Sequence, residues 1–140
     1  MLAEVRERCD AIEECYEFML AYAAQGLASD EGSQSDGQIR AFLRCAVKAM
    51  AEVAESCARA VKHERLEPAE RYAAFFAVVD RDARCSLAAM ELVLAQPAIS
   101  SQLIDNLNAS IHLRAILTDL SLVSEILNAQ TLPKPVVTSI

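Results

Sequence analysis

The chain has 140 residues, of which 54% are hydrophobic and 24% charged, and its formal net charge is −7. This length and composition indicate a single globular domain and exclude an intrinsically disordered chain. The acidic balance argues against nucleic-acid binding, which needs a basic face, and favours a basic partner or a basic patch on a second copy.

Charged residues interrupt every apolar stretch, so that no window of 18 or more residues is free of them. We therefore expect no membrane-spanning segment, and the first residues do not form a secretory signal. These features predict a cytoplasmic protein whose five cysteines are reduced.

The first predicted helix covers residues 2–27. Its apolar residues alternate spacings of three and four, a heptad pattern typical of helices that pack nearly parallel to their neighbours. They are Leu2, Val5, Cys9, Ile12, Tyr16, Met19 and Ala23. Nine acidic residues against only Arg6 and Arg8 place the whole net charge within residues 1–36, so we expect the first helix to be the acidic one.

Two further helices are predicted, over residues 35–64 and from residues 66–68 to a stop at Pro97. Ser35 and Gln38 have the spacing of a capping box at the start of the second helix. Pro68 is expected in the first turn of the third helix, where its missing N–H costs nothing. The heptad residues are Ile39, Leu43, Ala46, Met50, Val53, Cys57 and Ala60 in the second helix, and Tyr72, Phe76, Val79, Ala83, Ser86, Met90 and Val93 in the third.

The fourth predicted helix runs from a cap at Ser100 or Ser101 to about residue 129. It is the most apolar, and its large apolar residues do not fit on one face. Since no helix is central in a bundle of four, we expect this helix to contribute to a subunit interface, with a twofold homodimer as the commonest solution. The alternative is that the end of the chain folds back and covers it.

Residues 131–140 are not expected to be helical, because Pro133 and Pro135 force an extended path. The tail also carries Val136, Val137 and Ile140, which are too apolar for a tail that makes no contact and are candidate partner-binding residues. We expect this tail to pack on its own bundle or on a sister subunit, with the sheet edge of another protein as the alternative.

Together these elements predict an all-α fold, a single-domain antiparallel four-helix bundle over residues 1–130 with an extended, proline-containing C-terminal tail over residues 131–140. The short connections make consecutive helices antiparallel neighbours, and heptad spacing predicts crossing angles of about +20°. No sequence repeat is evident, which makes an α-solenoid the weaker alternative.

The cysteines suggest two cross-helix pairs. If the first two helices fold against each other about the middle of their loop, residue i lies opposite roughly residue 62 − i. Cys9 then comes near Cys57, and Cys15 near Cys45. Such pairs could hold a soft metal or act as a thiol switch, but no Cys-x-x-Cys spacing is present and packing of small buried residues is the favoured interpretation.

The histidines do not indicate a metal site. Alanine rather than glutamate precedes His63 and His112 by three residues, so the di-iron motif of helical bundles is absent. Asp105, His112 and Asp119 recur every seven residues and share a helix face, but neighbours are about 10.5 Å apart along the axis, too far for one site. We interpret these three as a solvated face.

A basic ridge is predicted at the start of the second helix, where Arg40, Arg44 and Lys48 follow at a spacing of four. The expected register places Lys48 near Glu14 and Arg44 near Glu17, which predicts a ladder of surface salt bridges. The alternative is a site for an anion or an acidic partner.

No Gly-rich phosphate loop and no hydrolase or zinc-protease motif occurs, and we expect no cofactor and no catalytic residue. The sequence therefore favours a non-catalytic interaction protein, an adaptor, assembly factor or small regulator, acting as a homodimer with a possible protein partner. A bundle that binds a metal or small cofactor, or senses redox state through core cysteines, is the alternative. An enzyme that uses carboxylates has the least support.

Overall fold

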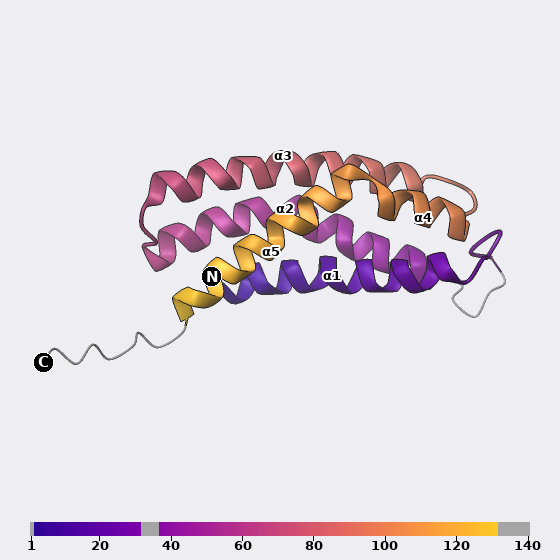
Figure 1. Cartoon of the computed structure of the whole chain (residues 1–140), viewed down its shortest axis with the longest axis horizontal. Helices are drawn as coiled ribbons and strands as arrows, with labels where there is room; N and C mark the ends of the chain where they lie inside the picture. Colours follow the sequence, from indigo (N-terminus) through magenta and orange to yellow (C-terminus); the bar gives the residue numbers. More distant parts are fainter. Residues whose placement is uncertain (1, 32–36, 132–140) are drawn as a thin grey trace, which may run out of the picture.

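The computed structural model describes residues 2–31 and 37–131. Within these residues the prediction of an all-α fold is confirmed, and the structure has five helices rather than four. They are α1 (Leu2–Ala24), α2 (Gln38–Glu64), α3 (Ala69–Leu94), α4 (Ser101–Ala109) and α5 (Ile111–Thr131). Figure 1 shows α1, α2 and α3 along the long axis of the molecule, with α5 crossing obliquely from the side of α3 to that of α1.

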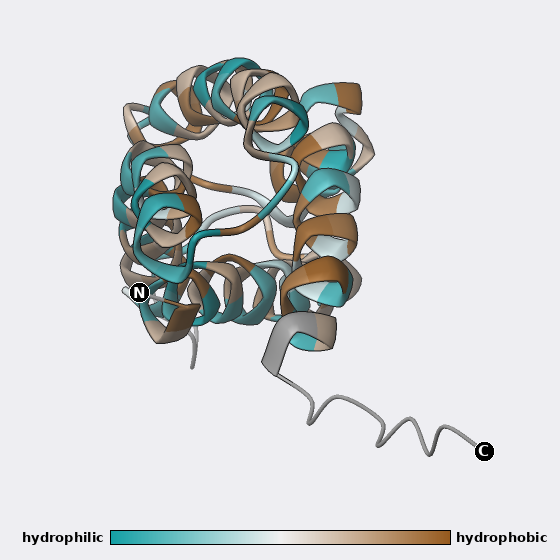
Figure 2. Cartoon of the chain, turned by 90° about the vertical axis from the view of Figure 1, so that its left-hand side faces the viewer, coloured by the Kyte–Doolittle hydropathy of each residue, from teal (hydrophilic) through white to brown (hydrophobic). Residues whose placement is uncertain are grey.

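The buried residues form one core, and the helices surround it when the molecule is seen end-on (Figure 2). All seven predicted heptad residues of α2 are buried, because their spacing places them on one helix face. In α1 the buried stripe ends at Tyr22, which is fully buried, rather than at Ala23. The helices thus present the expected apolar faces to a common interior.

The expected register between α1 and α2 is observed. Arg59 Nη2 lies 2.9 Å from Glu4 Oε1, and Phe18 stacks on Phe42 with ring centroids 4.4 Å apart. The loop midpoint estimated from the sequence was therefore close to the true one.

The ends of α1, α2 and α3 differ from the predictions. α1 ends at Ala24, three residues early, because Gly26 adopts a left-handed φ of 66°. α2 begins directly after Gly37, its N-cap, so Gln38 is the first helical residue and not the third position of a capping box; Ser35 lies outside the described residues. Pro68 is the N-cap of α3 rather than a residue of its first turn.

The single helix predicted over residues 101–129 is wrong, because Ser110 interrupts it. Ser110 has φ −60° and ψ 129°, an extended conformation. Its N–H donates to the carbonyl of Leu107, which closes α4, and its carbonyl accepts from the N–H of Arg114, which starts α5. The cap predicted at Ser100 is present, since its hydroxyl accepts from the N–H of Leu103.

The break at Ser110 redirects the last part of the chain. α4 packs mainly on α1, whereas α5 packs on α3 and also contacts α1. Asp105 is on α4 while His112 and Asp119 are on α5, so the face that these three residues were expected to share does not exist as one continuous face. None of the helices in the described part of the chain is long and apolar enough to cross a bilayer.

Candidate interaction surface

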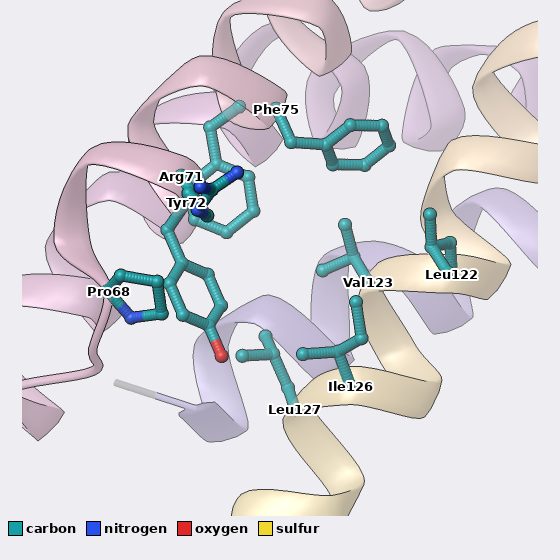
Figure 3. Close-up of a pocket in the computed structure, with 9 residues that line it drawn as sticks. Pro68, Arg71, Tyr72, Phe75, Leu122, Val123, Ile126 and Leu127 are labelled. Atoms are coloured by element: carbon teal, nitrogen blue, oxygen red, sulfur yellow. The ribbon is translucent and has the colours of Figure 1, made fainter.

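An apolar groove lies between the beginning of α3 and the second half of α5 and has a volume of about 240 Å³. Figure 3 shows side chains of the two helices facing one another across it. The residues that line it are Pro68, Arg71, Tyr72, Phe75 and Phe76 on one side, and Leu122, Val123, Ile126 and Leu127 on the other. We call this feature the α3–α5 groove.

The groove has a buried floor and an exposed rim. Phe76, Val123 and Leu127 are buried in the core. Leu122 and Ile126 on the outer side of α5 are 49% and 37% exposed. Side chains four residues apart on a helix share a face, so Leu122 and Ile126 together form the exposed rim and Val123 and Leu127 together form the buried floor.

The polar groups of the groove are hydrogen-bond donors. Arg71 is its single charged lining residue, and the Arg71 guanidinium makes no hydrogen bond or ion pair with any residue that the structure describes. The Tyr72 hydroxyl belongs to a ring that packs against Phe76, with centroids 6.0 Å apart. No carboxylate lines the groove, although the chain as a whole is acidic.

Arg40 of the predicted basic ridge has a structural role at the end of the molecule near the start of α4. Its Nε lies 2.7 Å from Oδ2 of Asp30, and its Nη atoms donate to the backbone carbonyls of Leu94 and Gln96. Asp30 also accepts from the N–H of Ile99 at 2.8 Å. Because these groups already satisfy the Arg40 guanidinium, it is not an open site for an anion.

The same end of the molecule holds a second set of buried hydrogen bonds. The Tyr22 hydroxyl donates to the carbonyl of Ile99 at 2.5 Å. Ser101 Oγ donates to the carbonyl of Tyr22 and accepts from the N–H of Leu27. Burial raises the pKa of Asp30, but the hydrogen bonds from Arg40 and Ile99 outweigh it and hold that pKa below its usual value. Sequence reasoning missed this network, which joins residues about 70 positions apart.

Arg44 and Lys48 are exposed, and the salt bridges predicted with Glu17 and Glu14 are absent from the described residues. Charged pairs do bridge α1 and α2, but at the other end of α2. There Arg59 pairs with Glu4, and Arg8 pairs with Glu52 at 2.8 Å, while Arg59 also pairs with Glu55 within α2. The ladder predicted at Arg44 and Lys48 is therefore wrong, and the ion pairs between the two helices are made by Arg8 and Arg59 instead.

The structure brings Cys9 near Cys57 and Cys45 near Cys15, close enough for one thiol to affect the pKa of the other. Cys9, Cys15 and Cys57 are buried and Cys45 is exposed, and all are free thiols. Burial, with a smaller contribution from Cys9, raises the pKa of Cys57 to about 12. Burial, together with Cys45, raises the pKa of Cys15 to about 12. Such thiols stay protonated at neutral pH, which disfavours both nucleophilic attack and metal ligation.

No group of three or more histidine, cysteine or acidic side chains that could hold a metal ion occurs in residues 2–31 and 37–131. His112 and Asp105 are exposed. Val136, Val137 and Ile140, the candidate partner-binding residues of the tail, lie outside the described residues.

Asp119 of α5 lies against Asp82 of α3, a pair that sequence reasoning did not find. Burial and then the neighbouring Asp82 carboxyl raise the pKa of Asp119 to about 7, against the opposing effect of Arg81. The register between α3 and α5 could have revealed this pair. Phe76 and Val123 line the same groove, and Asp82 follows Phe76 on α3 while Asp119 precedes Val123 on α5. The break at Ser110 made that register unpredictable.

Comparisons with protein-family models, with curated proteins and with solved structures find no match to this chain.

Proposed function

We propose that this chain is a non-catalytic helical-bundle interaction protein that forms a homodimer through the outer side of α5. The observation that carries the proposal is the exposed apolar rim of the α3–α5 groove, Leu122 and Ile126. In this proposal α4 and α5 together take the place of the fourth helix of an antiparallel bundle. The outer side of α5, with Leu122 and Ile126, then faces away from the core.

The distribution of exposed apolar side chains supports this choice of surface. Among the described residues, five large hydrophobic side chains are exposed, and Ile111, Leu122 and Ile126 belong to α5. Leu20 is on α1 and Leu92 on α3. Scattered exposed apolar side chains such as Leu20, Leu92 and Ile111 are ordinary, but Leu122 and Ile126 are adjacent to each other beside an apolar groove, which is typical of an interaction site.

Charge also favours this surface. Two copies of a chain with a net charge of −7 repel each other wherever acidic faces meet. The lining of the α3–α5 groove contains no carboxylate and one arginine. In a twofold dimer each copy presents the same surface to the other, so an acid-free groove lining lets two acidic subunits approach each other there.

The test is the molecular mass in solution of the wild type and of the double variant Leu122→Glu/Ile126→Glu. We expect a dimer for the wild type and a monomer for the variant, because two charges would be buried in the interface. Leu20→Glu is the matched control, since Leu20 is 48% exposed on α1 and Leu122 is 49% exposed on α5. The control should remain a dimer, and a dimeric double variant would contradict the proposal.

The second candidate, a bundle that binds a metal or small cofactor or senses redox state through its cysteines, has one favourable observation. Cys9 is close enough to Cys57, and Cys45 to Cys15, to influence the partner's pKa. The raised pKa of the buried thiols weighs against it. Native mass spectrometry of protein from its own host, with and without reductant, would support this candidate by an added mass or a change of state on reduction.

A further inference from the structure

Nine residues, 132–140, follow α5, whose last turns form one wall of the α3–α5 groove. We propose that this segment of one copy docks in the α3–α5 groove of a second copy, so that two reciprocal contacts hold the dimer together. The inference rests on the proposed function, and it names the element that fills the interface.

The segment has the length and pattern that the groove needs. From Val136 onward it is rich in β-branched residues, which favour extended backbone, and in an extended chain alternate side chains share a face. Val136 and Ile140 are therefore on one face and Val137 on the other. Four extended residues span about 13 Å, and the α3 wall from Pro68 to Phe76 is about 12 Å long at the helical rise. Val136 and Ile140 can thus occupy opposite ends of the groove at once.

Hydrogen-bonding groups are complementary as well. The groove offers the Arg71 guanidinium and the Tyr72 hydroxyl as donors and has no carboxylate. An extended segment offers backbone carbonyls as acceptors, while Pro133 and Pro135 have no N–H that docking would leave unsatisfied. The prolines also restrict the chain before binding, which lowers the entropy lost on docking.

The prolines favour a second copy over the groove of the same chain. To reach its own groove, the segment would have to reverse direction directly after Thr131. Residues that precede proline favour extended conformations, so Leu132 and Lys134 disfavour a turn. Pro133 and Pro135 themselves have a fixed φ. In such a conformation residues 132–135 would span about 13 Å. A segment that continues past the end of α5 would thus place Val136 beyond the groove of its own chain, where a second copy can receive it.

Single substitutions in the full chain test the face that docks. Val136→Asp and Ile140→Asp should each raise the dimer dissociation constant by about tenfold or more, since each places a charge in an apolar groove. Val137→Asp, on the opposite face and with the same change of charge, should raise it less than about threefold. Equal effects of all three substitutions, or none from Val136→Asp and Ile140→Asp, would overturn the inference.

A mixing experiment tests whether the contact joins two copies. One chain carries Val136→Asp/Ile140→Asp and keeps its groove, while a mass-tagged chain carries Leu122→Glu/Ile126→Glu and keeps its segment. We expect each alone to be monomeric and the mixture to contain a heterodimer in native mass spectrometry, because one segment–groove contact is restored. Thermal unfolding by circular dichroism establishes that both variants are folded.

The outcomes separate the two proposals. If the groove variant is monomeric but the segment variant dimerises like the wild type, the segment inference fails and the proposed function stands. Two monomeric variants without a heterodimer would also overturn the inference, because the segment would then not act between copies. A groove variant that remains a dimer would contradict the proposed function itself.

Discussion

Asp119 on α5 meets Asp82 on α3, and the Oδ2 atom of Asp119 is buried without a hydrogen-bond partner. Burial, and after it the neighbouring Asp82 carboxyl, favours the protonated form, which is why the pKa of Asp119 is raised from 3.8 to about 7. The pair makes the contact between the two groove-forming helices sensitive to pH.

The first prediction concerns stability against pH. Since the pKa of Asp119 is higher in the folded than in the unfolded chain, its contribution is fully present below pH 3.8 and is lost as the pH rises through about 7. Asp119→Asn should remove this dependence and raise the free energy of unfolding at pH 8 by about 1–2 kcal/mol, a value reduced for partial solvent exposure.

Urea unfolding at pH 5 and pH 8 measures this effect. Asp105→Asn, at an exposed position on α4, is the control and should leave the dependence unchanged. A stability of Asp119→Asn that varies between the two pH values as much as that of the wild type would show that the pair does not hold a proton.

The second prediction concerns the buried ion pair at the start of α4. Arg40→Ala should lower the free energy of unfolding by about 2–4 kcal/mol, because Asp30 would keep a buried charge without its main partner. The exposed Arg44→Ala should change it by less than about 0.5 kcal/mol. Chemical denaturation compares the two, and similar small losses would mean that Arg40 is not structural.

The third prediction concerns thiol reactivity. Cys45 and Cys85 are exposed, whereas Cys9, Cys15 and Cys57 are buried. In the folded protein an alkylating reagent should label the two exposed cysteines, and the other three should react only on unfolding. Peptide mapping after labelling with and without denaturant gives the answer. Fast labelling of Cys57 in the folded protein would contradict the packing interpretation and revive the redox alternative.

The fourth prediction concerns Asn108, beside the break between α4 and α5. Its Nδ2 and Oδ1 atoms are buried and have no hydrogen-bond partner among the described residues. Asn108→Leu should therefore raise the free energy of unfolding by about 1–2 kcal/mol. The exposed Asn106→Leu is the control. A loss of stability in Asn108→Leu would indicate that the amide has a partner in solution.

The parts of the fold that the sequence predicted are those governed by spacing along one helix. The heptad residues of α2 are all buried, and the predicted register of α1 against α2 is the one that brings Glu4 to Arg59. Both features depend on local periodicity, which a single sequence displays directly.

The parts that it missed depend on backbone or long-range hydrogen bonds. The apolar pattern continues through Ser110, so periodicity cannot reveal that its backbone is extended. Arg40 was assigned to a surface ridge because the carbonyls it donates to, those of Leu94 and Gln96 at the end of α3, are 54 and 56 positions away in sequence. The groove escaped notice for the same reason, since its two walls meet only when α5 is redirected across α3.

The most direct test of the central claim is sedimentation equilibrium of the unmodified chain over a dilution series. We expect a reversible equilibrium between a monomer of 15.3 kDa and a dimer of twice that mass. A mass that stays at 15.3 kDa at every concentration would contradict self-association through α5.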